Sequence, residues 1–430
     1  MYARLMSLGR SFNVLWGANA ASNLADGLAF VSMPLLAASL TDDPRWVAGL
    51  ATVYALVRLL AALPLGVWVD RADRRSLLAA ANLWRGGAVL VLALCVSYGA
   101  GGLLLLYGAF AVIGILESAA DNASVSLVPG IVASRNLDRA NSRLSAAQLI
   151  ADEFAGPPLG GFLFAVAAAA PVYAMGGLWA AAGFLALALP KRGLIPSRAG
   201  AAPAGTVELG AGGLSVAGTE RTSLWKEAAA GIRWLAKHRE VGGLALLGAL
   251  ASVGYMLPFS VLVLFAQQQL HVDTVGYGMI LSVSALGGLA GSYAAPRIRR
   301  RLGYRWTVVA SLLIGAGSLG ALAATRSGVV AALLLAAYIF HAVVWGICAT
   351  SIRQRLVPDD LRGRVNASSR VVGLLGLALG SALGGVLASW HIALPAAAGA
   401  LVFVVCAAVA ALLLSDVSRG TLRTVKQLDS

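Results

Sequence analysis

Long apolar runs separated by short polar segments dominate the chain. Each run is about 20 residues or longer, the length that an α-helix needs to cross the ~30 Å hydrocarbon core of a bilayer. The pattern therefore predicts an all-α integral membrane protein with twelve transmembrane helices. The predicted ranges are 12–40, 47–69, 76–98, 102–128, 140–166, 171–190, 242–269, 274–296, 305–325, 328–354, 364–389 and 392–414.

Positive residues fall almost wholly on one side of these predicted helices. Of the 33 Lys and Arg residues, 29 lie in the ends and connecting segments of one side, and only Arg45 and Arg326 lie on the other. The remaining two, Arg58 and Arg85, lie within the apolar runs. Because cytoplasmic loops carry the excess of positive charge, we expect both termini in the cytoplasm. The protein would then be a multi-pass protein of the plasma (inner) membrane.

The longest polar segment divides the predicted helices into two groups of six. This organisation gives a six-helix bundle over 1–190, a cytoplasmic linker over 191–241, a second six-helix bundle over 242–414 and a cytoplasmic tail over 415–430. Within the linker, 223–237 has one apolar helical face. That spacing predicts an amphipathic helix along the inner membrane surface, and a soluble helix packed against loops is the alternative.

Composition excludes several classes of protein. Hydrophobic residues make up 59% of the 430 residues and charged residues only 12%, about half of the 25% that is typical of soluble domains. The net charge of +14 does not indicate a nucleic-acid partner, because the arginines lie between the apolar runs. Cys95, Cys348 and Cys406 lie inside apolar runs, so we expect no metal site. The chain has no G-x-x-x-x-G-K-[ST] phosphate loop, so we do not expect ATP to drive its activity. We also expect that the protein uses no cofactor and is not an enzyme.

Two patterns recur in both halves at nearly the same offset. Arg139–Ala–Asn141 matches Arg364–Val–Asn366, and Gly156–Pro–Pro–Leu–Gly–Gly161 matches Gly380–Ser–Ala–Leu–Gly–Gly385. The offsets are 225 and 224 residues. Matched pairs of this kind predict a parallel structural repeat that joins the halves into one interlocked unit.

A compact charged turn, Gly66–Val–Trp–Val–Asp–Arg–Ala–Asp–Arg–Arg75, separates the second and third predicted helices. Its pattern G-x-x-x-D-R-x-x-R-R resembles the signature loop at the same place in major facilitator superfamily transporters, with Asp73 where that family usually has Gly. The resemblance implies a gating role for this loop, although a plain positive-inside cluster would carry the same charges. The implied gating residues are Gly66, Asp70, Arg71, Arg74 and Arg75.

A second motif indicates the direction of transport. Gly156–Pro157–x–x–Gly160–Gly161 resembles the G-P-x-x-G-G motif of family members that export by antiport, with Asp152 in place of the usual leading glycine. Segments 128–141 and 357–366 resemble the branch that contains enterobactin exporters and macrolide or drug efflux proteins. The resemblance implies a monomeric exporter of drug-like or natural-product molecules that is driven by the proton gradient. Ordinary packing of small residues in lipid is the alternative for the glycine motif.

Ionisable residues inside the predicted helices gather in the first half. A charge at mid-membrane costs at least ~2.5–3.5 kcal/mol on insertion scales, so such a group usually faces a cavity, a partner or an ion path. The family resemblance implies a central cavity lined by the first, fourth, seventh and tenth helices. The candidate proton-coupling and cavity residues are Asn19, Asn23, Asp26, Arg58, Glu117, Asp121, Asp152, Glu153 and His341.

Charge pairing distinguishes the candidates of the first half. Arg85 is expected to pair with Glu117 or Asp121, because the three residues share a depth in the membrane. Asp26 is the favoured coupling residue, since its own helix contains no group that neutralises it. Glu117 is the next candidate.

Two further residues leave alternatives open. Arg58 lies in the middle of the second predicted helix and could neutralise Asp26 or Asp152. His341 lies at mid-depth in the tenth predicted helix. It could bind protons or substrate, or it could be a packing residue, which is the commoner role of a lone histidine.

Within the predicted helices of the first half, the five candidate acids outnumber the two arginines, Arg58 and Arg85. This excess predicts amphipathic substrates that are neutral or cationic. The expected partners are therefore a small-molecule substrate, protons and the lipid bilayer. A siderophore exporter is the first alternative and a solute uptake carrier the second. A non-transporting membrane scaffold or receptor is the alternative from another class.

Overall fold

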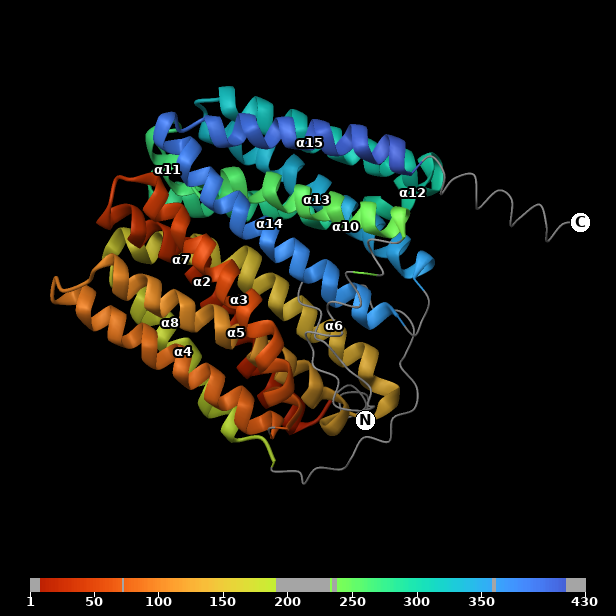
Figure 1. The fold of residues 1–430 in the computed structure, drawn as a ribbon. Coiled ribbons are helices and arrows are strands. Elements are labelled where there is room, and N and C mark those ends of the chain that lie inside the picture. The colour runs from red at the N-terminus through yellow and green to blue at the C-terminus, as the bar shows by residue number, and fades with distance from the viewer. Residues whose placement is uncertain (1–7, 72, 191–232, 234–237, 358–360, 415–430) are drawn as a thin grey trace, which may run out of the picture. The chain divides into compact units, whose positions relative to one another are not determined.

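The computed structural model describes residues 8–71, 73–190, 233, 238–357 and 361–414, excluding the side chains of 62–71, 239–240 and 362–364. Within these residues the chain forms helices and no strand (Figure 1). This result confirms the predicted all-α class. The predicted amphipathic helix over 223–237 lies outside the described residues apart from Arg233, and so does the tail over 415–430.

The helices follow the order of the apolar runs along the chain. Those of the first half are α2 (Arg10–Leu40), α3 (Pro44–Arg71), α4 (Arg74–Ser97), α5 (Leu103–Ile131), the short η1 (Ser134–Asn136), α6 (Leu137–Gln148), η2 (Leu149–Ala155), α7 (Gly156–Val166) and α8 (Ala170–Leu187). Those of the second half are α10 (Arg239–Phe259), α11 (Leu262–Gln268), α12 (Thr274–Ala324), α13 (Gly328–Leu356), α14 (Arg362–Trp390) and α15 (Leu394–Leu413).

Among the described residues, ten helical segments are long and apolar enough to cross a membrane. One of them, α12, covers two predicted spans, 274–296 and 305–325. It bends between them at Gly303, whose φ of 72° lies in the left-handed region that glycine adopts without a Cβ clash. The total of twelve spans and the cytoplasmic termini remain predictions.

The described helices group into two compact units. Unit 1 comprises 1–42, 60–203 and 272–282, and unit 2 comprises 43–59, 204–271 and 283–430. Each unit therefore includes a short segment from the other half of the sequence. In unit 1, α4 packs against α8 and α5, and α2 packs against α8 and α7. In unit 2, α10 (green) packs against α14 and α15 (blue) in Figure 1.

Two predicted spans are interrupted in ways that the apolar pattern did not reveal. The span predicted over 140–166 contains the π-helix η2, which is followed directly by Pro157 and Pro158 near the start of α7. Since a proline has no N–H, it cannot donate to the carbonyl four residues earlier. The hydrogen-bond ladder widens to the π pattern at this point, a change that often marks a functional site.

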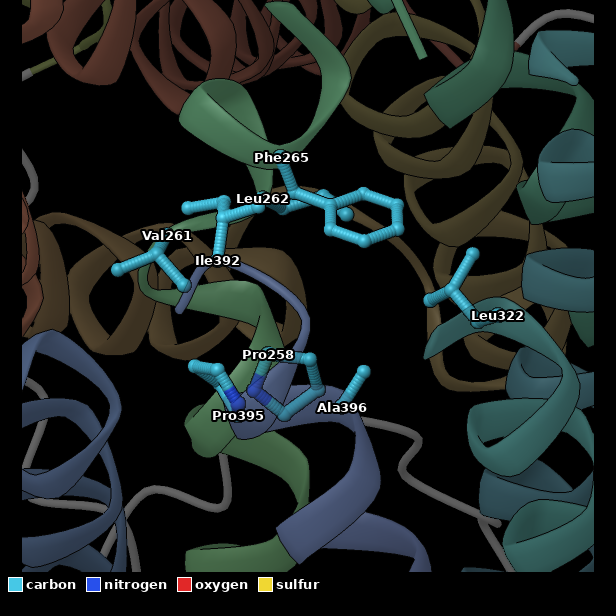
Figure 2. Close-up of a pocket in the computed structure, with 8 residues that line it drawn as sticks. All are labelled: Pro258, Val261, Leu262, Phe265, Leu322, Ile392, Pro395 and Ala396. Atoms are coloured by element: carbon cyan, nitrogen blue, oxygen red, sulfur yellow. The ribbon is translucent and has the colours of Figure 1, made fainter. Parts of the chain in front are cut away.

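The span predicted over 242–269 divides into α10 and α11 just after Pro258. A small apolar pocket lies at this break, and Figure 2 shows its lining side chains. The space between these side chains is too small to hold even a water molecule. It therefore represents loose packing around a helix break, with no polar side chain to orient a ligand. The lining residues are Pro258, Val261, Leu262, Phe265, Leu322, Ile392, Pro395 and Ala396.

Candidate functional site

A buried arginine lies at the centre of the polar residues in unit 1. Arg85, on α4, is completely buried, and its Nη1 donates to Oδ1 of Asp26 on α2 across 2.9 Å. Its Nη2 donates to Oγ of Ser22 at 2.8 Å and to Oδ1 of Asn82 at 2.7 Å. The guanidinium carbon lies 5.0 Å from the centre of the Trp179 ring, a cation–π contact with α8. Side chains of α2, α4 and α8 therefore surround the charged guanidinium group of Arg85.

This arrangement corrects the predicted partner of Arg85. The ion pair is made with Asp26 rather than with Glu117 or Asp121. A shared depth in the membrane does not fix the rotation of a helix, and it is rotation that selects the partner. The spacing did contain a signal that sequence reasoning missed: Ser22 precedes Asp26 by four residues and Asn82 precedes Arg85 by three, so each pair shares a helical face.

The π-helix η2 carries the next two candidates, Asp152 and Glu153. Its backbone lies against α2: a Cβ built on Gly27 would be 2.5 Å from the carbonyl oxygen of Asp152, and one on Gly156 would be 2.6 Å from the Cα of Gly27. Only glycines allow backbones to approach this closely. Asp152 is consequently held beside the residue that follows Asp26.

Carboxyl groups predicted from three separate spans lie within electrostatic range of Asp152. Those of Asp26, Glu117, Asp121 and Glu153 all lie close enough to repel a charge on Asp152. Asp26 forms an ion pair with Arg85. The cluster therefore contains more carboxyl groups than its buried arginine can balance.

The two asparagines of α2 contribute a neighbouring contact. Asn23 donates through Nδ2 to the carbonyl oxygen of Asn19 at 2.7 Å, and Asn19 donates through Nδ2 to Oγ of Ser124 at 3.3 Å. Ser124 lies on α5, so these side chains join the first and fourth predicted spans. They place α5, with its acids, beside the face of α2 that carries Asp26.

Arg58 lies in a different unit from these acids. Its Nη1 donates to the hydroxyl of Tyr54, one turn earlier on α3, at 2.9 Å, and its guanidinium carbon lies 5.2 Å from the Tyr54 ring centre. The sequence left open whether Arg58 neutralises Asp26 or Asp152. Asp26 forms an ion pair with Arg85, and the acid that Arg58 neutralises stays a prediction.

His341 lies in a group of aromatic rings in unit 2. The imidazole meets the rings of Tyr338 and Phe403 edge-on, with centroids 4.7 and 4.8 Å away. Tyr255 and Phe259 stack on each other and adjoin Tyr338. Neither imidazole nitrogen has a hydrogen-bond partner. These contacts fit the packing alternative for His341 and supply no acid that would hold a proton on it.

The glycines of the antiport-type motif make contacts that are repeated in the second half. Gly156 and Gly160 pack on α2, at Gly27 and at the Leu28 carbonyl. Gly161 meets the backbone of Thr274, at the start of α12.

The matching glycines of α14 pack in the same way. Gly380 and Gly384 lie against the carbonyls of Val253 and Leu257 on α10, and Gly385 lies against the start of α3. Contacts on equivalent helices agree with the parallel repeat predicted from the sequence.

The described part of the predicted gating loop caps helix ends. Arg74 donates to the carbonyl of Ser126 at 2.9 Å, and Arg75 donates to the carbonyl of Leu187. Asp73 caps α4 by accepting from the backbone N–H of Ser76 at 3.2 Å and from its hydroxyl at 2.7 Å. These bonds hold the pKa of Asp73 below its ordinary value, and they explain an acid at a position where the family usually has Gly. The side chains of Asp70 and Arg71 lie outside the described part of the structure, and so do the contacts of Gly66.

The sequence profile of the Major Facilitator Superfamily matches residues 15–236 and 244–428. The chain therefore belongs to this superfamily and is a multi-pass membrane transporter rather than an enzyme. A comparison with curated proteins gave no match. The narrower branch suggested by the sequence remains a prediction.

Solved structures of transporters share the fold. A bacterial homologue of the iron transporter ferroportin, in an inward-facing state, is 19% identical with a TM-score of 0.73, and the match covers 95% of this chain and 100% of that one. The nucleoside transporter NupG is 11% identical with a TM-score of 0.71, over 94% and 98% of the two chains. A bacterial metal transporter is 17% identical with a TM-score of 0.68, over 95% and 100%. At these identities the likeness shows the fold alone.

Proposed function

We propose that this chain is a proton-driven exporter with twelve transmembrane helices and both termini in the cytoplasm. Amphipathic neutral or cationic small molecules would leave the cell in exchange for protons, by alternating access between two six-helix bundles. The observation that carries this proposal is the position of Asp152 in a π-helix beside the Asp26–Arg85 pair. The family supports transport, and the glycine motif at 156–161 supports export by antiport.

Within this proposal Asp152 exchanges the coupling proton. The sequence favours Asp26, but its ion pair with a buried arginine stabilises its charge. Asp152 instead faces the repulsion of four other carboxyl groups, and a proton on Asp152 relieves it. Asp26 then serves as the fixed partner of Arg85, and Asp152 as the group whose charge changes during transport.

Competition for the same carboxylate couples the two movements. An ionised Asp152 attracts a cationic substrate, and a protonated Asp152 does not, so binding of a proton favours release of the substrate. The excess of carboxyl groups over arginine in the cluster around Asp152 also disfavours an anion in this low-dielectric environment. A neutral amphipathic molecule would be tolerated. For this reason we rank drug-like substrates above catecholate siderophores, whose iron complexes are anionic.

The alternatives predict different cargo or direction. The names of two structural neighbours raise a metal cation as a further candidate, although among the described residues no three His, Cys, Asp or Glu side chains are placed to hold a metal ion. A siderophore exporter, an uptake carrier and a non-transporting scaffold or receptor complete the set. The gating role of the loop at 66–75 is part of the same proposal.

Transport into inside-out membrane vesicles with an acidic interior tests the proposal. We expect ethidium, an amphipathic cation, to accumulate only while the pH gradient lasts, and to be lost when nigericin collapses it. Accumulation of a catecholate siderophore or of Fe²⁺ instead would establish the corresponding alternative. Accumulation in right-side-out vesicles alone would indicate uptake, and no transport by a well-folded protein would favour the scaffold.

A further inference from the structure

A cluster of arginines in unit 2 has no role in the proposed proton exchange. Across 293–306 and 351–357, where every residue is described, the sequence contains seven arginines and no Asp or Glu. Asp359 and Asp360 follow outside the described residues and could offset only two of these charges. We call this group the arginine patch. Its members are Arg297, Arg299, Arg300, Arg301, Arg305, Arg353 and Arg355.

One tyrosine brings arginines from two helices together. The guanidinium carbons of Arg299 on α12 and Arg355 on α13 lie 5.1 and 5.2 Å from the ring centre of Tyr304. Arg299 also donates through Nη1 to the Tyr304 hydroxyl at 2.8 Å. Gly303 turns the chain immediately before this tyrosine, with a φ of 72°. Two like charges held at one ring repel each other, and an anion within reach of both would weaken that repulsion.

Further donors in the patch have no acceptor among the residues that the structure describes. The Nε atoms of Arg305 and Arg353 are buried, and neither has a hydrogen-bond partner among the described residues. In unit 1, Arg74 and Arg75 at the same predicted side donate to backbone carbonyls, although the buried Nε of Arg75 also has no partner among the described residues. The patch of unit 2 therefore has both the charge and the spare donors that a phosphate oxygen would satisfy.

An apolar track on α12 leads to the patch and indicates a lipid. Leu286, Leu289, Tyr293 and Arg297 are spaced by three, four and four residues, so they share one helical face. The first three side chains are exposed, and the Arg297 guanidinium stacks 3.8 Å from the Tyr293 ring centre. Exposed aromatic rings beside arginines are typical of the membrane interface, where acyl chains end and headgroups begin.

We propose that the arginine patch binds the phosphate of an anionic glycerophospholipid in the cytoplasmic leaflet. The acyl chains would lie along the exposed face of α12 that ends at Tyr293. The phosphate would lie between Arg299 and Arg355 at Tyr304. Basic pockets at the cytoplasmic ends of membrane helices commonly bind such headgroups. This site is separate from Asp152, so the proposal does not depend on proton exchange.

Native mass spectrometry of the full chain, purified in detergent with added phosphatidylglycerol or phosphatidylcholine, tests the proposal. We expect the wild type to retain phosphatidylglycerol preferentially. Arg299→Gln with Arg355→Gln should reduce this retention roughly thirtyfold, since each of the two arginines near an anionic surface contributes ~1 kcal/mol. Arg10→Gln with Arg135→Gln removes the same charge from exposed sites on the same predicted side and should leave retention unchanged.

Three results would overturn the proposal. They are equal retention by the wild type and the R299Q/R355Q variant, an equal loss in the R10Q/R135Q control, and displacement of the lipid by millimolar inorganic phosphate. The last would identify a soluble anion as the ligand. Arg299→Lys with Arg355→Lys provides a second variant should R299Q/R355Q fold poorly. It keeps the charge but loses the planar fork, so we expect retention between those of the wild type and the R299Q/R355Q variant.

Discussion

Arg85 and Asp26 join two predicted membrane spans through a 2.9 Å ion pair in which the arginine is completely buried. An arginine does not lose its proton inside a protein, so the partner of Arg85 has to remain charged as long as the pair is intact. The pair thus separates the roles of neighbouring acids. Asp26 balances Arg85, and Asp152 in η2 is available to gain and lose a proton.

Substitution of Asp26 and substitution of Arg85 should destabilise the protein by different amounts. Asp26→Asn leaves a buried arginine without a counter-charge, and removing one partner of a buried pair typically costs about 3–5 kcal/mol. Arg85→Gln should cost less, because the remaining carboxyl group can take up a proton. The double variant should be more stable than Asp26→Asn alone. Thermal unfolding of the purified proteins measures the three effects, and additive losses in the double variant would argue against a coupled pair.

The close approach of α2 and η2 gives a prediction with matched controls. A Cβ on Gly27 or Gly156 would lie 2.5–2.6 Å from the facing backbone, so alanine at either position should push the two helices apart. We expect a loss of stability of about 1–3 kcal/mol and a loss of transport. Alanine at Gly17, on the same helix, or at Gly177 meets no atom closer than 3.8 Å and should be tolerated. Wild-type transport by Gly27→Ala would contradict the role of this contact.

The apolar pattern and the charges predicted the helices, but not the partners within them. Polar residues in lipid-length runs identified Asp26, Arg85 and Asp152 as candidates, since each is costly in hydrocarbon. Pairing depends on helix rotation and on contacts between distant residues, and so Arg85 was assigned to the wrong acids. The π-helix was not predicted because the spacing of apolar residues does not distinguish its backbone hydrogen bonds from those of an α-helix. Pro157, which interrupts those hydrogen bonds, was the one signal in the sequence.

Asp73 should stabilise α4 in a pH-dependent manner. As the N-cap it contributes about 1 kcal/mol, so Asp73→Ala should destabilise by that amount and Asp73→Gly by only a few tenths. Its pKa is lowered in the folded state, so this contribution is present above the unfolded pKa of about 4 and is lost as the pH falls through the lower folded value. Thermal unfolding between pH 7 and pH 3 should show the gap between wild type and Asp73→Ala closing. A difference in stability that does not change with pH would exclude a contribution from the charged form of Asp73.

The packing of His341 against α12 can be tested through a glycine. A Cβ on Gly315 would lie 2.5–2.7 Å from three atoms of the imidazole, whereas one on Gly317 would meet nothing within 4 Å. We expect Gly315→Ala to destabilise by about 1–3 kcal/mol and Gly317→Ala to have little effect. His341→Leu should retain transport if His341 is a packing residue. Loss of transport in a stable His341→Leu protein would instead assign the histidine to protons or substrate.

The proton released when substrate binds tests the central claim most directly. Purified protein in weakly buffered detergent solution, followed with a pH-sensitive dye, should release protons when ethidium is added. Asp152→Asn should bind ethidium more weakly and, at saturating ethidium, release no proton, whereas Glu153→Gln, its neighbour in η2, should release protons like the wild type. Proton release by Asp152→Asn equal to that of the wild type would contradict the assignment of the coupling proton to Asp152.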